Sequence, residues 1–373
     1  MVTRFKIDPK VLEWAINATD LSSEQIEEKA QKFELIKWKS GKKDPTIHQI
    51  QAFAIEFHIP FGYLFLKTPP KEDISILAFR TVENRPAEIS RGFQEVIQKM
   101  QTRQEWMRDE LIEAGVTNLG IVGKFSNEKR TDTIADYIRS LLNFPALQKT
   151  TNIDLFFKKL KYNISNQNIM VMQDGVVNGN TQRSLSIKEV RAFVLIDDYA
   201  PLIFLNTQDS KPAKIFSLLH EFVHILRGSD EVLSTEKQTW EERFINKVVE
   251  KVLMPKKEFE NKFSLSGIED TAHMFHVSVY AAGIRAKNLG LMQQKDLDEI
   301  IRNSHYMNKT EGKKSDGGNF YYTALSRTDP VFTNRVINSY NARKTSTTEA
   351  ASLMGVSLKS FKKFIVKFQE RYN

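Results

Sequence analysis

Residues His220-Glu221-Phe222-Val223-His224 have the types and spacing to hold a metal ion and to act on a water molecule. On a helix, His220 and His224 lie four residues apart on one face, so both imidazoles can reach one ion. Glu221 is next to the first histidine and can contact a water in the same cavity. This is the HExxH pattern, in which two histidines bind zinc and the glutamate is the general base. The pattern also occurs by chance with two ordinary core histidines.

The residues around this motif favour the metal interpretation. They are apolar nearly all round the expected helix, and a helix of that kind is buried. Buried imidazoles and carboxylates need partners, because desolvation of an unpaired polar group is costly. The chain contains no cysteine, which excludes disulfides, cysteine-ligated metals and thiol catalysis. Any metal must therefore be held by His, Asp or Glu.

A third ligand is expected on the helix that follows. Catalytic zinc takes three protein ligands and keeps a fourth position open. Glu242 and Asn246 are four residues apart, so we predict Glu242 as the third ligand and Asn246 as a hydrogen-bonding partner that orients a ligand. Glu241 is the competing ligand; otherwise it is an exposed carboxylate near the helix start. His276 or Tyr280 could approach the site and stabilise an oxyanion.

The elements that position these residues can be read from the hydrophobic pattern. Two helices over 211–227 and 236–253 carry the motif and Glu242, and two strands over 192–196 and 201–205 form a hairpin before them. Upstream, the pattern predicts a long helix over 88–113 and helix starts at Asp8-Pro9, Ser22 or Ser23, Thr46 and Thr131. The predicted fold class is α+β, mostly helical, with a small sheet.

The motif and the helix after it resemble the ImmA/IrrE family of zinc metallopeptidases. In that family, HExxH is followed by a Glu-x-x-Ala-Asn helix that runs into Leu-Met-Pro. Here Glu242, Asn246 and Leu253-Met254-Pro255 stand at the matching spacing, with Ile245 in place of the alanine. Residues 276–291 resemble a later helix of the family, and the likeness covers about residues 130–300. The resemblance implies a zincin-like core and cleavage of one specific protein, a transcriptional repressor, which derepresses genes.

The N-terminal region is similar to part of another module. Residues 38–65 resemble the end of an XRE-like helix-turn-helix, and residues 77–86 resemble the linker that follows it in such fusions. Only seven residues separate Ala30 from Trp38, which leaves a short recognition helix. Lys37, Lys39, Lys42 and Lys43 could contact phosphates. Alternatively, the domain serves packing or protein contacts.

The C-terminal region carries most of the excess charge. The chain has a formal net charge of +8, and residues 309–373 contain 12 Lys and Arg against 5 Asp and Glu. An alanine-rich helix, Gly355 and a Ser357-capped helix form a helix-turn-helix-like hairpin. Its last helix carries four lysines, most of them expected on one side, where they could bind DNA or recruit an acidic partner: Lys359, Lys362, Lys363 and Lys367.

We therefore predict four regions: an XRE-like domain over 1–68, a linker and long helix over 69–129, a metallopeptidase domain over 130–307, and a basic helical domain over 308–373. The predicted function is a zinc-dependent endopeptidase. The alternative is a DNA-binding regulator, or a toxin–antitoxin or phage-related protein, with a non-proteolytic peptidase fold. Apolar runs are too short to cross a bilayer and no signal peptide is visible, so we expect a cytoplasmic protein. Gly123-Lys124 lacks the other residues of a phosphate-binding loop.

Overall fold

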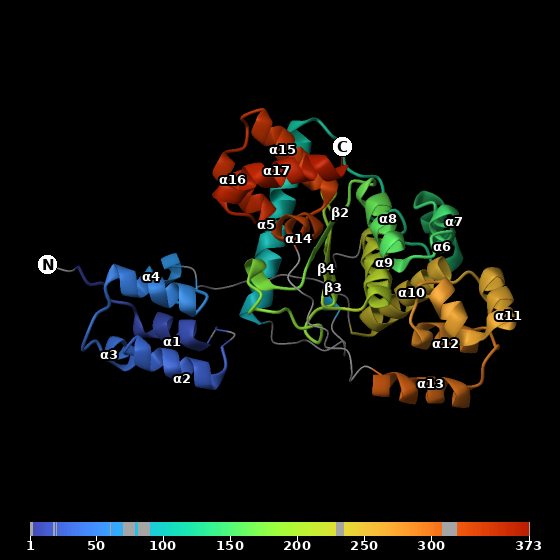
Figure 1. The fold of residues 1–373 in the computed structure, drawn as a ribbon, viewed down its shortest axis with the longest axis horizontal. Helices are drawn as coiled ribbons and strands as arrows, with labels where there is room; N and C mark the ends of the chain where they lie inside the picture. Colours follow the sequence, from blue (N-terminus) through green and yellow to red (C-terminus); the bar gives the residue numbers. More distant parts are fainter. Residues whose placement is uncertain are drawn as a thin grey trace. The chain divides into compact units, whose positions relative to one another are not determined.

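The computed structural model describes residues 3–17, 19, 21–59, 61–69, 79–80, 90–228, 235–307 and 319–372. These residues form 17 α-helices and one four-stranded sheet, so the α+β, mostly helical prediction is confirmed (Figure 1). The chain divides into two compact units, residues 1–75 with 86–98 and residues 76–85 with 99–373. The finer division into four regions stays a prediction. None of the described helices combines the length and apolar character that a bilayer crossing requires.

The first unit is a small helical cluster. Ser22 and Thr46 each form a capping box at the start of a helix, which confirms two predicted starts. The aromatic rings of Phe33, Trp38 and Phe53 pack together in its core. Its elements are α1 (Pro9–Asn17), α2 (Ser23–Lys32), α3 (Leu35–Lys39), α4 (Ile47–Glu56), the 3-10 helix η1 (Phe61–Phe65) and the first part of α5 (Arg91–Glu113).

Helix α3 occupies the place of the shortened recognition helix and has only five residues. Hydrogen bonds from Lys37 and Lys43 lower the pKa of Glu34 to about 2, and Lys39 lies 3.3 Å from a carboxylate oxygen of Glu13. Three of the four lysines that could contact phosphates therefore already have acidic partners in this unit. DNA contact by these lysines stays a prediction.

The sheet of the second unit has the strand order β1-β3-β4-β2. The predicted hairpin is confirmed as β3 (Ala192–Leu195) and β4 (Leu202–Asn206), which pair antiparallel. Strand β1 (Phe79–Arg80) pairs antiparallel with β3, and β2 (Met170–Asp174) pairs parallel with β4. Strand β2 is not among the strands that we predicted, because its residues, MVMQD, have little of the β-branched and aromatic composition typical of strands.

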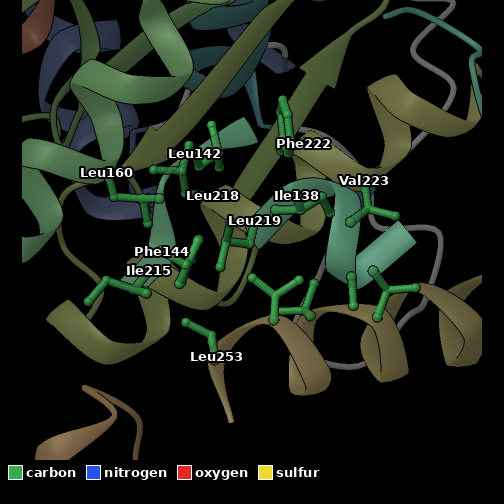
Figure 2. Packing of buried hydrophobic residues seen from close by; sticks show 14 of the residues in the cluster. Ile138, Leu142, Phe144, Leu160, Ile215, Leu218, Leu219, Phe222, Val223 and Leu253 are labelled. Carbon is green, nitrogen blue, oxygen red and sulfur yellow. The ribbon is translucent and has the colours of Figure 1, made fainter. Parts of the chain in front are cut away.

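Helix α9 (Lys211–Arg227) packs against strands β3 and β4 and against helices α8 and α10. Figure 2 shows the buried side chains of this core, in which Leu218, Leu219 and Phe222 of α9 lie among residues from α6, α7, α8 and the end of α10. The helices of this region are α6 (Thr131–Leu141), α7 (Phe144–Leu147), α8 (Ile153–Ser165), α10 (Thr235–Leu253), α11 (Lys256–Met274), α12 (Val279–Asn288) and α13 (Gln294–Met307), with the 3-10 helix η2 (Val177–Gly179).

The helix start predicted at Thr131 is confirmed, but the Thr131 side chain does not cap the helix. Thr131 is the first residue of α6, and Arg130 occupies the capping position without a side-chain hydrogen bond. The Thr131 hydroxyl instead accepts a hydrogen bond of 2.8 Å from Lys251 of α10. A contact between two helices has replaced the local cap that the sequence suggested.

The C-terminal helices are joined to the sheet through β2. Asp329 caps α15 with one carboxylate oxygen and accepts a hydrogen bond of 3.1 Å from the Val171 backbone with the other. Gln173 of β2 donates a hydrogen bond of 2.8 Å to the Ser326 carbonyl. The elements are α14 (Phe320–Arg327), α15 (Pro330–Asn341), α16 (Thr347–Met354) and α17 (Leu358–Tyr372).

Two predicted boundaries fall mainly outside the described part of the chain. At the start of the predicted domain over 308–373, residues 308–319 are described only at Asn319, which caps α14. At the predicted boundary between the regions 1–68 and 69–129, the chain is described as far as Pro69 and again from Phe79. The predicted turn between α16 and α17 is confirmed, with Gly355 in the left-handed conformation and the Ser357 hydroxyl accepting a hydrogen bond from the Ser360 backbone.

Candidate metal centre

The local sequence fixes both ends of the helix that carries the motif. Ser210 caps the start of α9, Pro212 stands in its first turn, and Gly228 ends it in the left-handed conformation. Between these ends the helix is almost wholly buried. His220 and Glu221 are each 1% exposed and His224 is 6% exposed. The helix therefore holds two imidazoles and a carboxylate inside the protein, where they require polar partners.

The C-terminal end of α9 is held by the segment around Gly123. The Gly123 and Phe125 backbones donate hydrogen bonds of 2.9 and 2.8 Å to the carbonyls of Ile225 and Leu226, the last carbonyls of the helix. A Cβ atom at Gly228 would lie only 2.7 Å from the Gly123 Cα. The glycine that suggested a phosphate loop thus has a different use, which is close backbone approach beside the motif.

Three side chains from α9 and α10 converge on one point. The Nε2 atoms of His220 and His224 lie 3.2 Å apart, and the Glu242 carboxylate oxygens lie 3.2 Å from the first and 3.3 Å from the second. The ligand atoms of this group all lie within 4.8 Å of one another, so the group could hold a metal ion. Ligands about 2.0–2.1 Å from a tetrahedral zinc ion lie about 3.3 Å apart, so these separations fit.

Asn246 contacts His220 through Nδ1, the ring nitrogen that does not face Glu242. Its side-chain oxygen lies 3.2 Å from His220 Nδ1, and because an amide oxygen can only accept, the imidazole donates there. In the neutral imidazole, this leaves His220 Nε2 with a lone pair that faces His224 and Glu242, as a metal ligand requires. The structure thus places Asn246 where it can orient a ligand, as its spacing from Glu242 predicts.

The charges of this group are coupled. Burial alone would raise the pKa of Glu242, but hydrogen bonds with His220 and His224 outweigh it and hold that pKa well below its usual range. Burial alone would lower the pKa of His224, but the hydrogen bond with Glu242 and the charge of Glu221 outweigh it and raise that pKa. Glu242 is therefore ionised. A metal ion that binds here competes with a proton for the imidazole of His224.

Glu241 points away from this group and has its own partner. The Arg227 guanidinium donates two hydrogen bonds to its carboxylate, of 2.6 Å from Nε and 3.0 Å from Nη2. Both side chains are only 8% exposed. Arg227 also donates to the carbonyls of Phe125 and Glu128, at 2.6 and 2.7 Å. Of the two candidate carboxylates, the structure brings Glu242 to the histidines.

Arg227 was missed by sequence reasoning. It joins the end of α9, the start of α10 and the segment before α6, and its guanidinium lies 4.9 Å from the centre of the Phe244 ring. Its partners stand between 14 and 102 positions away, so no local spacing could reveal them.

The other candidates lie apart from the group. His276 is 5% exposed and its Nε2 lies 2.7 Å from the Thr150 carbonyl, and burial lowers the pKa of its imidazole. Tyr280 is 46% exposed and lines a cavity beside Asn246. Neither is among the residues that converge with His220.

The four predicted DNA-binding lysines all lie on α17, opposite its buried Phe361, Phe364 and Phe368. Lys359, Lys362 and Lys363 are exposed. Lys363 lies 5.1 Å from the centre of the Tyr321 ring, and Lys367 donates a hydrogen bond to Glu370. The lysines therefore share an outer face, although two of them have partners within the protein.

Comparison with known proteins places a family match over the candidate metal centre. Residues 179–287 match the family model described as the IrrE N-terminal-like domain, a peptidase family. The matched segment contains His220, Glu221, His224, Glu242 and Asn246, and it does not include the N-terminal unit. No curated protein and no solved structure gives a match. Residues 179–287 therefore resemble the IrrE peptidase domain, and this match supports a metallopeptidase-type activity for the second unit.

Proposed function

We propose that this protein is a zinc-dependent endopeptidase that cleaves one specific protein, a transcriptional repressor, and so derepresses genes. The observation that carries the proposal is the convergence of His220, His224 and Glu242 within 4.8 Å of one another, beside the buried Glu221. Two imidazoles and one carboxylate, with no cysteine in the chain, form a ligand set that suits zinc.

Each residue of the site has a role in this mechanism. Zinc, when bound, supplies a Lewis acid that polarises the peptide carbonyl. Glu221 takes a proton from the attacking water onto its carboxylate and then passes it to the leaving amine. Asn246 orients the His220 ring through its 3.2 Å contact. The Arg227–Glu241 pair holds α10 against α9, which keeps Glu242 facing the histidines.

The choice of substrate rests on the family resemblance. ImmA/IrrE-like peptidases act on repressors, and the likeness of residues 38–65 to part of an XRE-like module is in keeping with a role in transcription. The alternative is a DNA-binding regulator, or a toxin–antitoxin or phage-related protein, with a non-proteolytic peptidase fold. An intact ligand set with an adjacent buried glutamate favours the enzyme.

The test separates metal binding from catalysis. Zinc-loaded protein is incubated with candidate repressors encoded by neighbouring genes, and one specific cut is expected. Glu221→Gln should keep about one zinc per chain yet lower the cleavage rate by about 100- to 10,000-fold, because an amide cannot accept the proton. The His220→Ala/His224→Ala variant should lose zinc. Wild-type cleavage by Glu221→Gln would refute the mechanism, and zinc retention by the double variant would refute the site.

A further inference from the structure

A cavity of about 490 Å³ lies next to the candidate metal centre. Its walls come from the first half of α9, the second half of α10 and the start of α12. Apolar side chains form most of its lining, and they are Pro212, Ala213, Phe216, Met254, Val277, Ala281 and Ile284. The volume is in the range of cavities that hold small ligands and substrate side chains.

Two residues of the lining lie beside His220 of the candidate metal centre. Asn246 lines it and lies 3.2 Å from His220 Nδ1. Phe216 lines it one helical turn before His220, and the two ring centres are 6.3 Å apart. An extended polypeptide advances about 3.3 Å per residue. At that spacing, the cavity beside His220 is within reach of a side chain close to a peptide bond at the metal centre.

The charged groups of the lining are already paired. Arg191 donates a hydrogen bond of 3.2 Å to Asp209, and the Glu250 carboxylate accepts one of 2.7 Å from Arg285 and one of 3.3 Å from Asn288. A charged substrate side chain would have to displace one of these ion pairs. Each of these two charged side chains of the lining therefore already has a partner of opposite charge.

The hydroxyl oxygens of Ser210 and Ser278 already accept backbone hydrogen bonds, although each hydroxyl can still donate. They cap α9 and α12, where they accept hydrogen bonds of 3.4 Å from the Ala213 backbone and 3.1 Å from the Ala281 backbone. The contacts that remain for a ligand are mainly apolar, together with these two hydroxyl donors, the Asn246 amide and the exposed Tyr280. Such a lining favours an uncharged, apolar side chain over a polar one.

We infer that this cavity is a specificity pocket, which selects a large apolar side chain such as Leu, Met or Phe next to the cleaved bond. The inference rests on the proposed peptidase function and names the substrate class for it. The target is thus a polypeptide that presents an apolar residue, normally buried in a folded domain, in an accessible or unfolded segment.

The first experiment measures binding and does not depend on cleavage. The zinc-loaded full-length chain, labelled at Ile and Met methyl groups, is titrated with N-acetyl-leucinamide and with N-acetyl-glycinamide. Leucinamide should shift the Ile284 and Met254 signals with a Kd at least about tenfold lower, because only it buries an isobutyl group. Equal effects of the two amides, or no effect at these methyls, would overturn the inference.

Two variants narrow the pocket from different helices, Ala281→Phe on α12 and Ala213→Phe on α9. Each should weaken leucinamide binding by at least about tenfold. Ala342→Phe is the matched control, since Ala342 is exposed and outside the lining, and it should bind as the wild type does. Unchanged binding in a folded narrowed variant would overturn the inference.

The second experiment uses cleavage to separate this inference from the proposed function. Wild-type enzyme acting on a mixture of synthetic peptides should cut beside Leu, Met or Phe, and Ala281→Phe should shift the cuts toward Ala or Gly. Cuts with no apolar preference would overturn the pocket while leaving the peptidase in place. If no repressor and no peptide is cut, the proposed function fails, and the methyl titration still decides whether the cavity binds apolar side chains.

Discussion

Glu241 and Glu242 are neighbours in the sequence with different partners in the structure. Glu242 lies 3.2 and 3.3 Å from the two histidines, whereas Glu241 forms a buried, two-bond ion pair with Arg227. The i,i+4 spacing from Glu242 to Asn246 was enough to prefer Glu242, because a helix places both on one face. The role of Glu241 could not be predicted in the same way, since Arg227 belongs to another helix.

Substitution of each glutamate by alanine should therefore give opposite results. Glu242→Ala should weaken zinc binding by at least about 100-fold, because it removes one of the three proposed ligands. Loss of a residue that only orients a ligand costs about 10–100-fold. Glu241→Ala should lower the free energy of unfolding by about 3–5 kcal/mol, because it leaves the Arg227 charge buried and unpaired.

These two effects can be measured on the same preparations. Competition with a chromophoric chelator gives zinc affinity, and urea unfolding gives stability, with each variant serving as the other's control. If Glu241→Ala loses zinc while Glu242→Ala retains it, the two assignments are reversed.

Among the elements, α9 was the most predictable. Its bounds follow from Ser210, Pro212 and Gly228, which are local signals, and the hairpin of β3 and β4 follows from two short apolar runs around Asp197-Asp198. Strand β2 was not predictable from its own residues, because it exists through its parallel pairing with β4. The segment that holds the end of α9 was equally hidden, since it lies about 100 residues away.

The contact at the end of α9 leads to a prediction about Gly228. Its φ of 63° already disfavours a side chain, and a Cβ atom there would lie 2.7 Å from the Gly123 Cα. Gly228→Ala should therefore cost about 1 kcal/mol for the conformation and more for the displaced backbone. Because the clash begins four residues after His224, zinc affinity should fall as well.

Gly115→Ala is the matched control for this effect. Gly115 has a similar φ of 72°, but no atom lies within 4 Å of the place that a Cβ atom would take there. Thermal unfolding and zinc titration of both variants measure the difference. Equal losses of stability would show that conformation alone, and not the contact with Gly123, accounts for the Gly228 effect.

At the scale of the whole molecule, positive charge is concentrated in the C-terminal residues, and the lysines of α17 share an outer face. If this face binds DNA, Lys359→Glu/Lys362→Glu should weaken binding of the full-length protein to duplex DNA. The slope of log affinity against log salt should become shallower by about 1.8, for two lost phosphate contacts. Fluorescence anisotropy at several salt concentrations measures both quantities.

The control for the DNA-binding experiment must change the net charge by the same amount and leave the lysines of α17 unchanged. Lys257→Glu/Lys295→Glu does so at two exposed positions on α11 and α13. Equal binding by the two double variants would assign the α17 face to an acidic protein partner or to solvent. Substitution is preferable to truncation here, because Asp329 and Ser326 hydrogen-bond to β2 and belong to the fold of the second unit.

The hydrogen bonds of Asp329 and Ser326 with β2 also have a consequence for aggregation. Strand β2 ends the strand order of the sheet, and an open sheet edge can recruit a strand from another molecule and start aggregation. The Val171 N–H, on the side away from β4, is taken by the Asp329 carboxylate, which is only 1% exposed, and Gln173 binds the Ser326 carbonyl beside it. A buried carboxylate at that position cannot be replaced by the backbone of an incoming strand without losing the cap of α15. The C-terminal helices therefore cover this edge of the sheet and oppose edge-to-edge association of the second unit.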